Sequence, residues 1–307
     1  MKSSLPICVL ALLACCGASA QITVEVMLDQ QQFLPAESLP VAVRITNRSG
    51  QPMHLGVETN WLTFSVSAVD NFIVPRIADP PVLGEFDLDS GKMATKRLDL
   101  APYFKLERQG SYRIVATLHI KDWDKEVPSL PKTFDVIDGA KLWSQAFGLP
   151  ASGGPPNAAP EVRKYTLEQA NYLKDQLRMY VMVSDAAETH VFKVRAIGPM
   201  VSFSQPEAQL DPLSRLHVLY QSGAHDYTYT VVTPDGDLVG QEKYDYLNTP
   251  RPRLQVDADG NITVYGGMRR VKPNLDDYPA LMPSSQTPDP VPANPKPPVI
   301  PPGHSSK

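Results

Sequence analysis

The chain has 307 residues, of which 42% are hydrophobic and 20% charged, and its formal net charge at pH 7 is −4. Nucleic-acid binding requires a basic face, so this mildly acidic balance argues against a nucleic-acid partner. Setting aside an N-terminal leader and a C-terminal tail leaves about 250 residues, enough for two domains with hydrophobic cores.

The first twenty residues have the features of a secretory signal peptide. Lys2 supplies a positive charge, residues 5–16 are almost all apolar, and Ala18 and Ala20 form a cleavage site before Gln21. The apolar stretch is too short to be a stable membrane anchor. We therefore assign residues 1–20 to a signal peptide. We expect an extracytoplasmic protein, periplasmic or secreted, with no transmembrane segment after cleavage.

All three cysteines lie inside this leader, at Cys8, Cys15 and Cys16, so the mature chain is predicted to have no disulfide. The run Leu12-Leu13-Ala14-Cys15 resembles a bacterial lipobox. Lipidation at Cys15 would anchor the protein to a membrane surface. The well-formed Ala18/Ala20 site favours soluble export, and the lipoprotein stays the alternative.

Residues 21–137 are predicted to form a β-sandwich. Apolar and polar residues alternate with the period of a half-buried strand, and turn residues recur between the alternating segments. The predicted strands are 22–28, 39–46, 61–66, 112–120 and 132–137.

The segment Gln109-Gly110-Ser111-Tyr112-Arg113-Ile114 resembles the immunoglobulin-fold pattern in which Gly-x-Tyr precedes a core residue. The resemblance implies that the Tyr112 hydroxyl bonds back to nearby backbone at a strand corner, and that Val43 and Trp61 occupy core positions. Ile114 stands where antibody domains have cysteine. The domain therefore resembles bacterial immunoglobulin-like domains without a disulfide, a fold that hosts many functions.

Two segments of this domain suggest function. Residues 68–93 form a long connection rich in proline and acidic residues, and loops of this length are often functional, so we expect a binding loop here. Asn47-Arg48-Ser49 matches the N-glycosylation pattern. A turn that begins with asparagine explains the same three residues, and it is the favoured interpretation for a bacterial protein.

Residues 138–160 are expected to be a linker, in which Lys141–Phe147 forms a short helix or an irregular connection and Gly153–Pro156 a loop. Residues 161–271 contain a weak repeat of about 37 residues. Arg178–Val183 matches Arg215–Tyr220, and Arg253–Val256 begins a third copy.

This repeat resembles β-propeller blades, although three units cannot close a ring. The ordinary rhythm of antiparallel hairpins also accounts for the repeat and is the favoured interpretation. Both interpretations predict an antiparallel β domain of blade-like meanders. Eleven of the 31 prolines lie beyond Arg270, and residues 272–307 are predicted to be a disordered proline-rich tail.

No set of residues in the sequence completes a catalytic, cofactor or metal site. His190, His217 and His225 lie in or beside the repeat strands, where they and Glu188 could converge on a metal, but ordinary strand histidines explain them more simply. The segment Asp257–Asn261 hints at a calcium loop, but it lacks the distal glutamate, and a hairpin turn also accounts for it. We therefore assign no catalytic, cofactor-binding or metal-binding residue.

The sequence thus predicts an all-β exported protein with a non-catalytic binding or scaffolding role, its partner an envelope polymer or protein. The arrangement resembles exported proteins of environmental bacteria. The alternative is a hydrolase that acts on an extracellular or envelope polymer through the second domain, in a pocket with convergent carboxylates or histidines. A flat surface of exposed aromatics would favour binding. The candidates for such a surface are Tyr227, Tyr229, Tyr244 and Tyr246. Cross-strand pairing on a sheet is the simpler explanation of these tyrosines.

Overall fold

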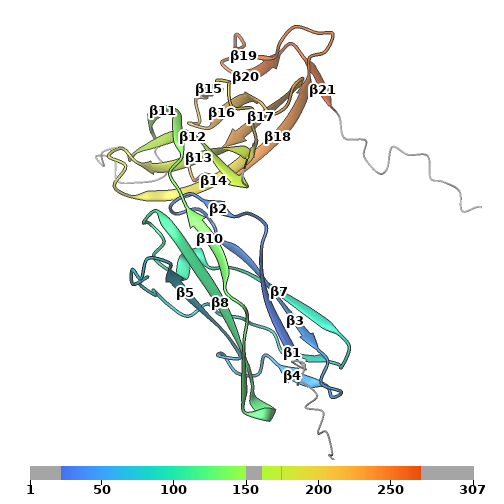
Figure 1. Cartoon of the computed structure of the whole chain (residues 1–307). Helices are drawn as coiled ribbons and strands as arrows, with labels where there is room; N and C mark the ends of the chain where they lie inside the picture. Colours follow the sequence, from blue (N-terminus) through green and yellow to red (C-terminus); the bar gives the residue numbers. More distant parts are fainter. Residues whose placement is uncertain (1–21, 150–160, 174, 271–307) are drawn as a thin grey trace, which may run out of the picture. The chain divides into compact units, whose positions relative to one another are not determined.

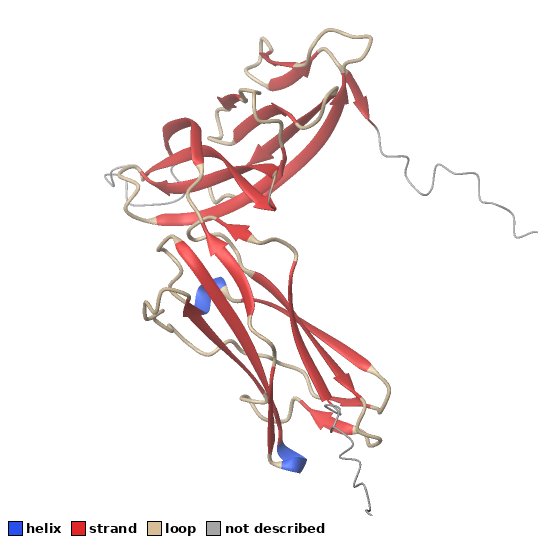
Figure 2. Ribbon diagram, in the orientation of Figure 1, coloured by secondary structure: helices blue, strands red, loops and turns tan. Residues whose placement is uncertain are grey.

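The computed structural model describes residues 22–149, 161–173 and 175–270. Their regular secondary structure consists of strands joined by loops and turns, apart from two short 3-10 helices (Figures 1 and 2). The predicted all-β class is therefore confirmed. The segments predicted to be a signal peptide, the Gly153–Pro156 loop and a disordered tail lie outside the described residues. Among those that are described, no helix is long and apolar enough to cross a membrane.

The first domain contains two main antiparallel sheets. One has the order β1-β3-β7 and the other the order β2-β10-β8-β5, with β9 also paired to β8 and β2 parallel to β10. A small third sheet pairs β4 with β6. The strands are β1 (Ile22–Leu28), β2 (Gln32–Phe33), β3 (Pro40–Asn47), β4 (Met53–Leu55), β5 (Leu62–Ala68), β6 (Phe86–Leu88), β7 (Met93–Asp99), β8 (Gly110–Ile120), β9 (Lys125–Pro128) and β10 (Lys132–Val136). The helices are η1 (Ala101–Tyr103) and η2 (Lys121–Trp123).

One hydrophobic core joins the two main sheets. Alternate residues of β1, β3 and β8 point into it, as the period of two requires. Val43 and Trp61, both predicted core residues, are 0% and 2% exposed, and Ile114 is fully buried. Ile114 therefore contributes apolar packing to this core.

Tyr112 makes the strand-corner hydrogen bond that the sequence pattern implies. Its hydroxyl donates to the carbonyl oxygen of Arg108 at 2.5 Å, while its ring is buried and stacks on Phe134. Gly110, two residues earlier, has a φ of +150°, in the region that favours glycine. The bond therefore fixes the entry into β8.

Asn47 lies at the end of β3 and is fully buried. Its Nδ2 donates to the carbonyls of Gln51 at 2.7 Å and Leu88 at 2.8 Å. Its Oδ1 accepts from the Ser49 amide at 2.9 Å and the Ser49 hydroxyl at 2.7 Å. Every donor and acceptor of the amide is used, so Asn47 organises a turn and is not accessible to a glycosylating enzyme in the folded protein.

A strand lies in the segment that the sequence predicts to be a linker. The segment expected to be a linker, with a helix or irregular connection at Lys141–Phe147, contains β11 (Ala140–Gly148), the edge strand of the sheet β11-β12-β13-β14. The helix expectation was wrong because pairing along nearly all of β11 with β12 supplies the backbone bonds, and Phe147 stacks on Tyr165. The other strands of this sheet are β12 (Val162–Leu173), β13 (Gln176–Asp185) and β14 (Val191–Pro199).

Two further sheets complete this domain, with the orders β15-β16-β17-β18-β21 and β19-β20. One apolar cluster joins the β11–β14 sheet to the β15–β18 sheet, and a second joins the latter to β19 and β20. The sequence repeat corresponds to the hairpins β13–β14, β16–β17 and β19–β20, one in each sheet. The strands are β15 (Glu207–Leu210), β16 (Leu216–Gln221), β17 (Asp226–Val232), β18 (Leu238–Asp245), β19 (Arg253–Val256), β20 (Ile262–Tyr265) and β21 (Met268–Arg270).

The segment around β2 contacts the second domain. The Gln31 amide donates to the Tyr172 carbonyl at 2.9 Å. Leu34 packs in a small apolar cluster with Ala170, Tyr180 and Val194. Leu34 therefore packs against residues of β12, β13 and β14.

Candidate functional site

An apolar pocket of about 320 Å³ opens in the first domain between β2, η1, β10 and residues 104–107. Its deep walls are Phe33, Leu39, Phe104 and Phe134, none more than 4% exposed. The ring of Phe33 meets that of Phe134 edge-on at 5.6 Å, and Phe134 stacks on Tyr112. Because the walls belong to the packed core, the pocket is preformed.

The long loop predicted to bind a partner forms one side of the pocket. Ile77 lines it, and two backbone bonds hold this part of the loop against η1 and the residue after Phe104: Ile77 to the Tyr103 carbonyl at 2.9 Å, and Lys105 to the Pro75 carbonyl at 3.0 Å. Further along the loop, Trp61 Nε1 donates to the carbonyl of buried Val82 at 2.8 Å. The loop is therefore fixed at both places.

Although the loop is fixed, it exposes large apolar side chains. Phe72 is 42% exposed, Ile73 83%, Ile77 66% and Leu83 78%. A single exposed apolar residue needs no explanation, but several on one fixed segment beside an apolar pocket indicate an interaction surface. We call the pocket together with Phe72, Ile73 and Ile77 the apolar site.

The charged groups around the apolar site are neutralised in pairs. Arg76 pairs with Asp79, Arg108 pairs with Asp70 at 3.0 Å, and Lys105 lies 3.4 Å from Glu107. The rim therefore presents little net charge to a partner.

Glu37 is the one buried carboxyl of the pocket, at 9% exposed. It accepts hydrogen bonds from Gln30 Nε2 at 2.9 Å and from the Leu34 amide at 2.8 Å. Burial raises its pKa above the ordinary value, although these bonds and Arg178 oppose the shift. Because both oxygens are already bonded, Glu37 shapes the β2–β3 connection and is not free to act on a bound group.

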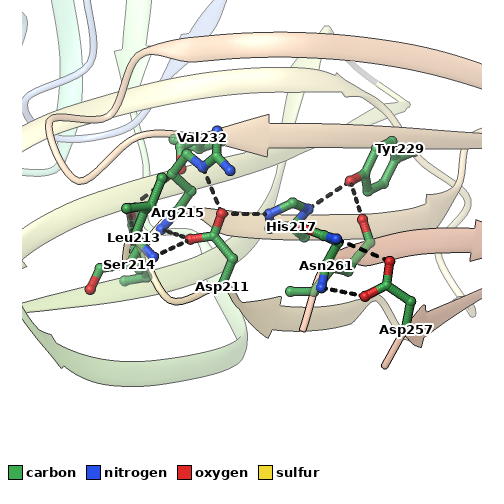
Figure 3. A network of polar contacts seen from close by, with 11 residues as sticks. Asp211, Leu213, Ser214, Arg215, His217, Tyr229, Val232, Asp257 and Asn261 are labelled. Atoms are coloured by element: carbon green, nitrogen blue, oxygen red, sulfur yellow. Dashed lines mark hydrogen bonds and ion pairs between the residues drawn. The ribbon is translucent and has the colours of Figure 1, made fainter. Parts of the chain in front are cut away.

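A polar network in the second domain has the residue types of catalytic chemistry (Figure 3). Asp211 accepts bonds from the Arg215 guanidinium at 2.6 Å and from His217 Nε2 at 3.3 Å. The other ring nitrogen of His217 lies 2.6 Å from the Tyr229 hydroxyl, which also contacts the Ile262 carbonyl. The network thus connects β16, β17 and β20.

Burial prevents this network from reaching a substrate. The side chains of Asp211 and His217 are only 4% and 7% exposed. Burial lowers the pKa of His217. For Asp211, hydrogen bonds from Arg215 and His217 outweigh burial and hold the pKa below its ordinary value. The arrangement is therefore a neutral histidine beside a carboxylate, holding three strands together.

The residues considered for a metal site do not converge. His190 packs edge-on against Phe192, His225 lies beside Tyr246, and Glu188 pairs with Lys141 at 2.9 Å and Lys164 at 2.7 Å. Within residues 22–149, 161–173 and 175–270, no group of three or more His, Cys, Asp or Glu side chains has a metal-binding arrangement.

The segment Asp257–Asn261 is the hairpin turn between β19 and β20. The Asp257 carboxylate accepts bonds from the amides of Asp259 at 3.0 Å and Asn261 at 2.8 Å. Its oxygens thus serve the turn, as the simpler interpretation predicted.

The four tyrosines of the second domain do not form an exposed aromatic surface. Tyr227 and Tyr244 face each other across β17 and β18 and are 3% and 9% exposed. Tyr229 and Tyr246 are half-buried against the same cluster, which includes Leu254 and Ile262. Cross-strand pairing beneath β19 and β20 therefore explains them.

Sequence reasoning missed the pocket itself. Phe33 lies in a two-residue strand, and residues 100–107 include a single helical turn and otherwise irregular backbone, so neither segment shows a periodic pattern. The apolar run Leu100-Ala101-Pro102-Tyr103-Phe104 was the available signal.

Comparison with known proteins gives only a weak structural similarity. No family model matches the chain, and no curated protein matches it. One solved structure, of the sporulation control protein Spo0M from Bacillus subtilis, aligns over 56% of this chain and 82% of that chain with 11% sequence identity and a TM-score of 0.30. A similarity of this size carries no argument about fold or function.

Proposed function

We propose that this chain is an exported, non-catalytic binding or scaffolding protein whose first domain is an immunoglobulin-like module that captures a partner through the apolar site. The observation that carries the proposal is the preformed pocket walled by Phe33, Phe104 and Phe134 beside a fixed loop with exposed Ile73 and Ile77. The sheet orders and the Tyr112 strand-corner bond support the immunoglobulin-like assignment.

Export is part of the proposal and rests on the N-terminal sequence. Cleavage before Gln21 yields the mature protein, and intact-mass analysis of protein from the extracytoplasmic fraction tests it. We expect a mass that begins at Gln21. A lipid-modified N-terminus at Cys15 would place the protein on a membrane surface instead.

The hydrolase alternative is not favoured. It requires acid, base or nucleophile groups that can touch a substrate in the second domain. Asp211 and His217 have the right chemistry, but their side chains are buried and their polar atoms are bonded to neighbouring strands.

Binding of a neutral apolar dye, N-phenyl-1-naphthylamine, tests the proposed function on the mature protein. We expect saturable one-site fluorescence enhancement. Ile77→Asp places a charge at the mouth of the pocket and should weaken binding by roughly tenfold, equivalent to about 1.4 kcal/mol. The matched control is Leu130→Asp, because Leu130 is 86% exposed and does not line this pocket. Absence of saturable binding, or equal loss in the control, contradicts the proposal.

A further inference from the structure

We propose that the natural partner is a protein that inserts one large apolar side chain into the pocket and covers Ile73 and Ile77 with the residues around it. This inference rests on the proposed function and names its partner class.

The size of the site favours a protein over a small molecule. The pocket volume of about 320 Å³ lies at the low end of the range for small-molecule sites and suits one large side chain. A ligand confined to the pocket would leave Ile73, which is 83% exposed, uncovered. Covering both requires an occupant that extends beyond the pocket, as a protein surface does around a buried anchor residue.

The apolar residues outside the pocket flank its rim. Pro75 accepts the Lys105 amide bond, which places the chain between Ile73 and Ile77 beside the pocket-lining residue Lys105. The Phe72 ring lies 4.8 Å from the guanidinium of Arg108, the residue that follows Glu107 on the rim. These contacts place Phe72 and the segment between Ile73 and Ile77 beside the residues at the pocket rim.

Charge complementarity narrows the partner further. The rim cations Arg76, Lys105 and Arg108 each have a carboxylate partner on the same domain. An anionic polymer or lipid headgroup would compete with these pairs and gain little. A neutral, apolar segment of a protein fits such a rim.

The backbone around the apolar site is held in place before a partner binds. Bonds from Ile77 to Tyr103 and from Lys105 to Pro75 hold the loop before a partner arrives. Binding therefore costs little loop-ordering entropy, and the gain from burying apolar surface is retained.

Selection of a phage-displayed random 12-residue peptide library against the mature protein tests the inference. We expect enriched peptides that share one large apolar residue and displace N-phenyl-1-naphthylamine. Ile73→Asp and Ile77→Asp should each bind such peptides at least tenfold more weakly, while Leu130→Asp binds them as the wild type does. The substituted side chains are largely exposed, so the variants should melt as the wild type does, which circular dichroism checks.

The outcomes separate this inference from the proposed function. A protein that binds the dye but enriches no dye-displacing peptide, or whose peptides bind Ile73→Asp and Ile77→Asp unchanged, overturns the protein partner and leaves the pocket as a small-molecule site. Enrichment that disappears when the chain is truncated after Arg270 would show that the tail recognises the peptides and also overturns it. A protein that does not bind the dye at all fails the proposed function itself.

Discussion

Replacing Asn47 tests whether the turn after β3 depends on the amide rather than on the sugar-acceptor pattern. Asn47→Asp keeps the shape of the side chain, but an oxygen replaces the Nδ2 amide group that donates to the carbonyls of Gln51 and Leu88. In Asn47→Ala the acceptor for Ser49 is lost as well.

The magnitude follows from the bonds removed. Each lost hydrogen bond that leaves a buried partner unsatisfied costs about 1–2 kcal/mol, so the two lost bonds predict a loss of about 2–4 kcal/mol for Asn47→Asp. Asn47→Ala also loses the two bonds from Ser49 and should lose at least as much. The new carboxyl of Asn47→Asp faces two carbonyl oxygens, so its pKa in the folded state lies above the unfolded value of about 3.9. The folded state then prefers the protonated form, and the Asp variant should recover part of its stability below about pH 4 and lose it as the pH rises.

Urea unfolding followed by the fluorescence of tryptophan, with Trp61 buried in this domain, measures both effects. The matched control is Asn60→Ala, because Asn60 is exposed; its stability should change by less than about 0.5 kcal/mol. If Asn47→Ala lowers the free energy of unfolding by less than about 0.5 kcal/mol, the account of this turn is refuted. A glycan found on Asn47 in folded protein would refute it as well.

Three further predictions follow from other contacts. Tyr112→Phe removes the bond to Arg108 and should cost about 1 kcal/mol in urea unfolding, whereas Tyr103→Phe should be nearly neutral; equal stability of Tyr112→Phe and wild type would refute the strand-corner bond. Burial lowers the pKa of His217, so the free energy of unfolding should fall as the pH drops below about 6.5, by at most ~1.4 kcal/mol per pH unit. His217→Gln should reduce this pH dependence, and an unchanged dependence would contradict the burial of a neutral histidine. Zinc, calcium or a chelator should not change the Tm, and a saturable rise would reveal a native-state metal site.

Strands with strict alternation were predictable, because one face of each packs on a core. Residues 22–28 match β1, and the strand expected at 112–120 is β8, with Tyr112 making the bond that its motif implies. β7 went unnoticed because Met93–Asp99 is an edge strand with no fully buried residue and no apolar alternation. A periodic sequence pattern indicates a buried face, and β7 has no buried residue to produce such a pattern.

The second domain shows what a repeat can and cannot predict. The offset between Arg178–Val183 and Arg215–Tyr220 correctly relates β13 to β16, although these strands lie in different sheets. The strand β11 was missed because its inward contact depends mainly on Phe147, and its hydrogen bonds come from β12, which lies beyond the Gly153–Pro156 segment.

The candidate site was half predictable. The length and proline content of residues 68–93 indicated a binding loop, and the structure places Ile77 of that loop on an apolar pocket. The pocket walls come from β2, the end of η1 and β10, three short segments far apart in the sequence. Only tertiary packing brings Phe33, Phe104 and Phe134 together, so no local sequence pattern could predict that they line one pocket.

The most direct test of the central claim is to locate an apolar probe on the mature protein by NMR. Titration of ¹⁵N-labelled protein with indole should produce saturable amide shifts concentrated at residues 33–39 and 101–107, and Ile77→Asp should weaken them while Leu130→Asp leaves them unchanged. Shifts that do not saturate, or that concentrate on the second domain around β18, would contradict the assignment of the apolar site as the binding site.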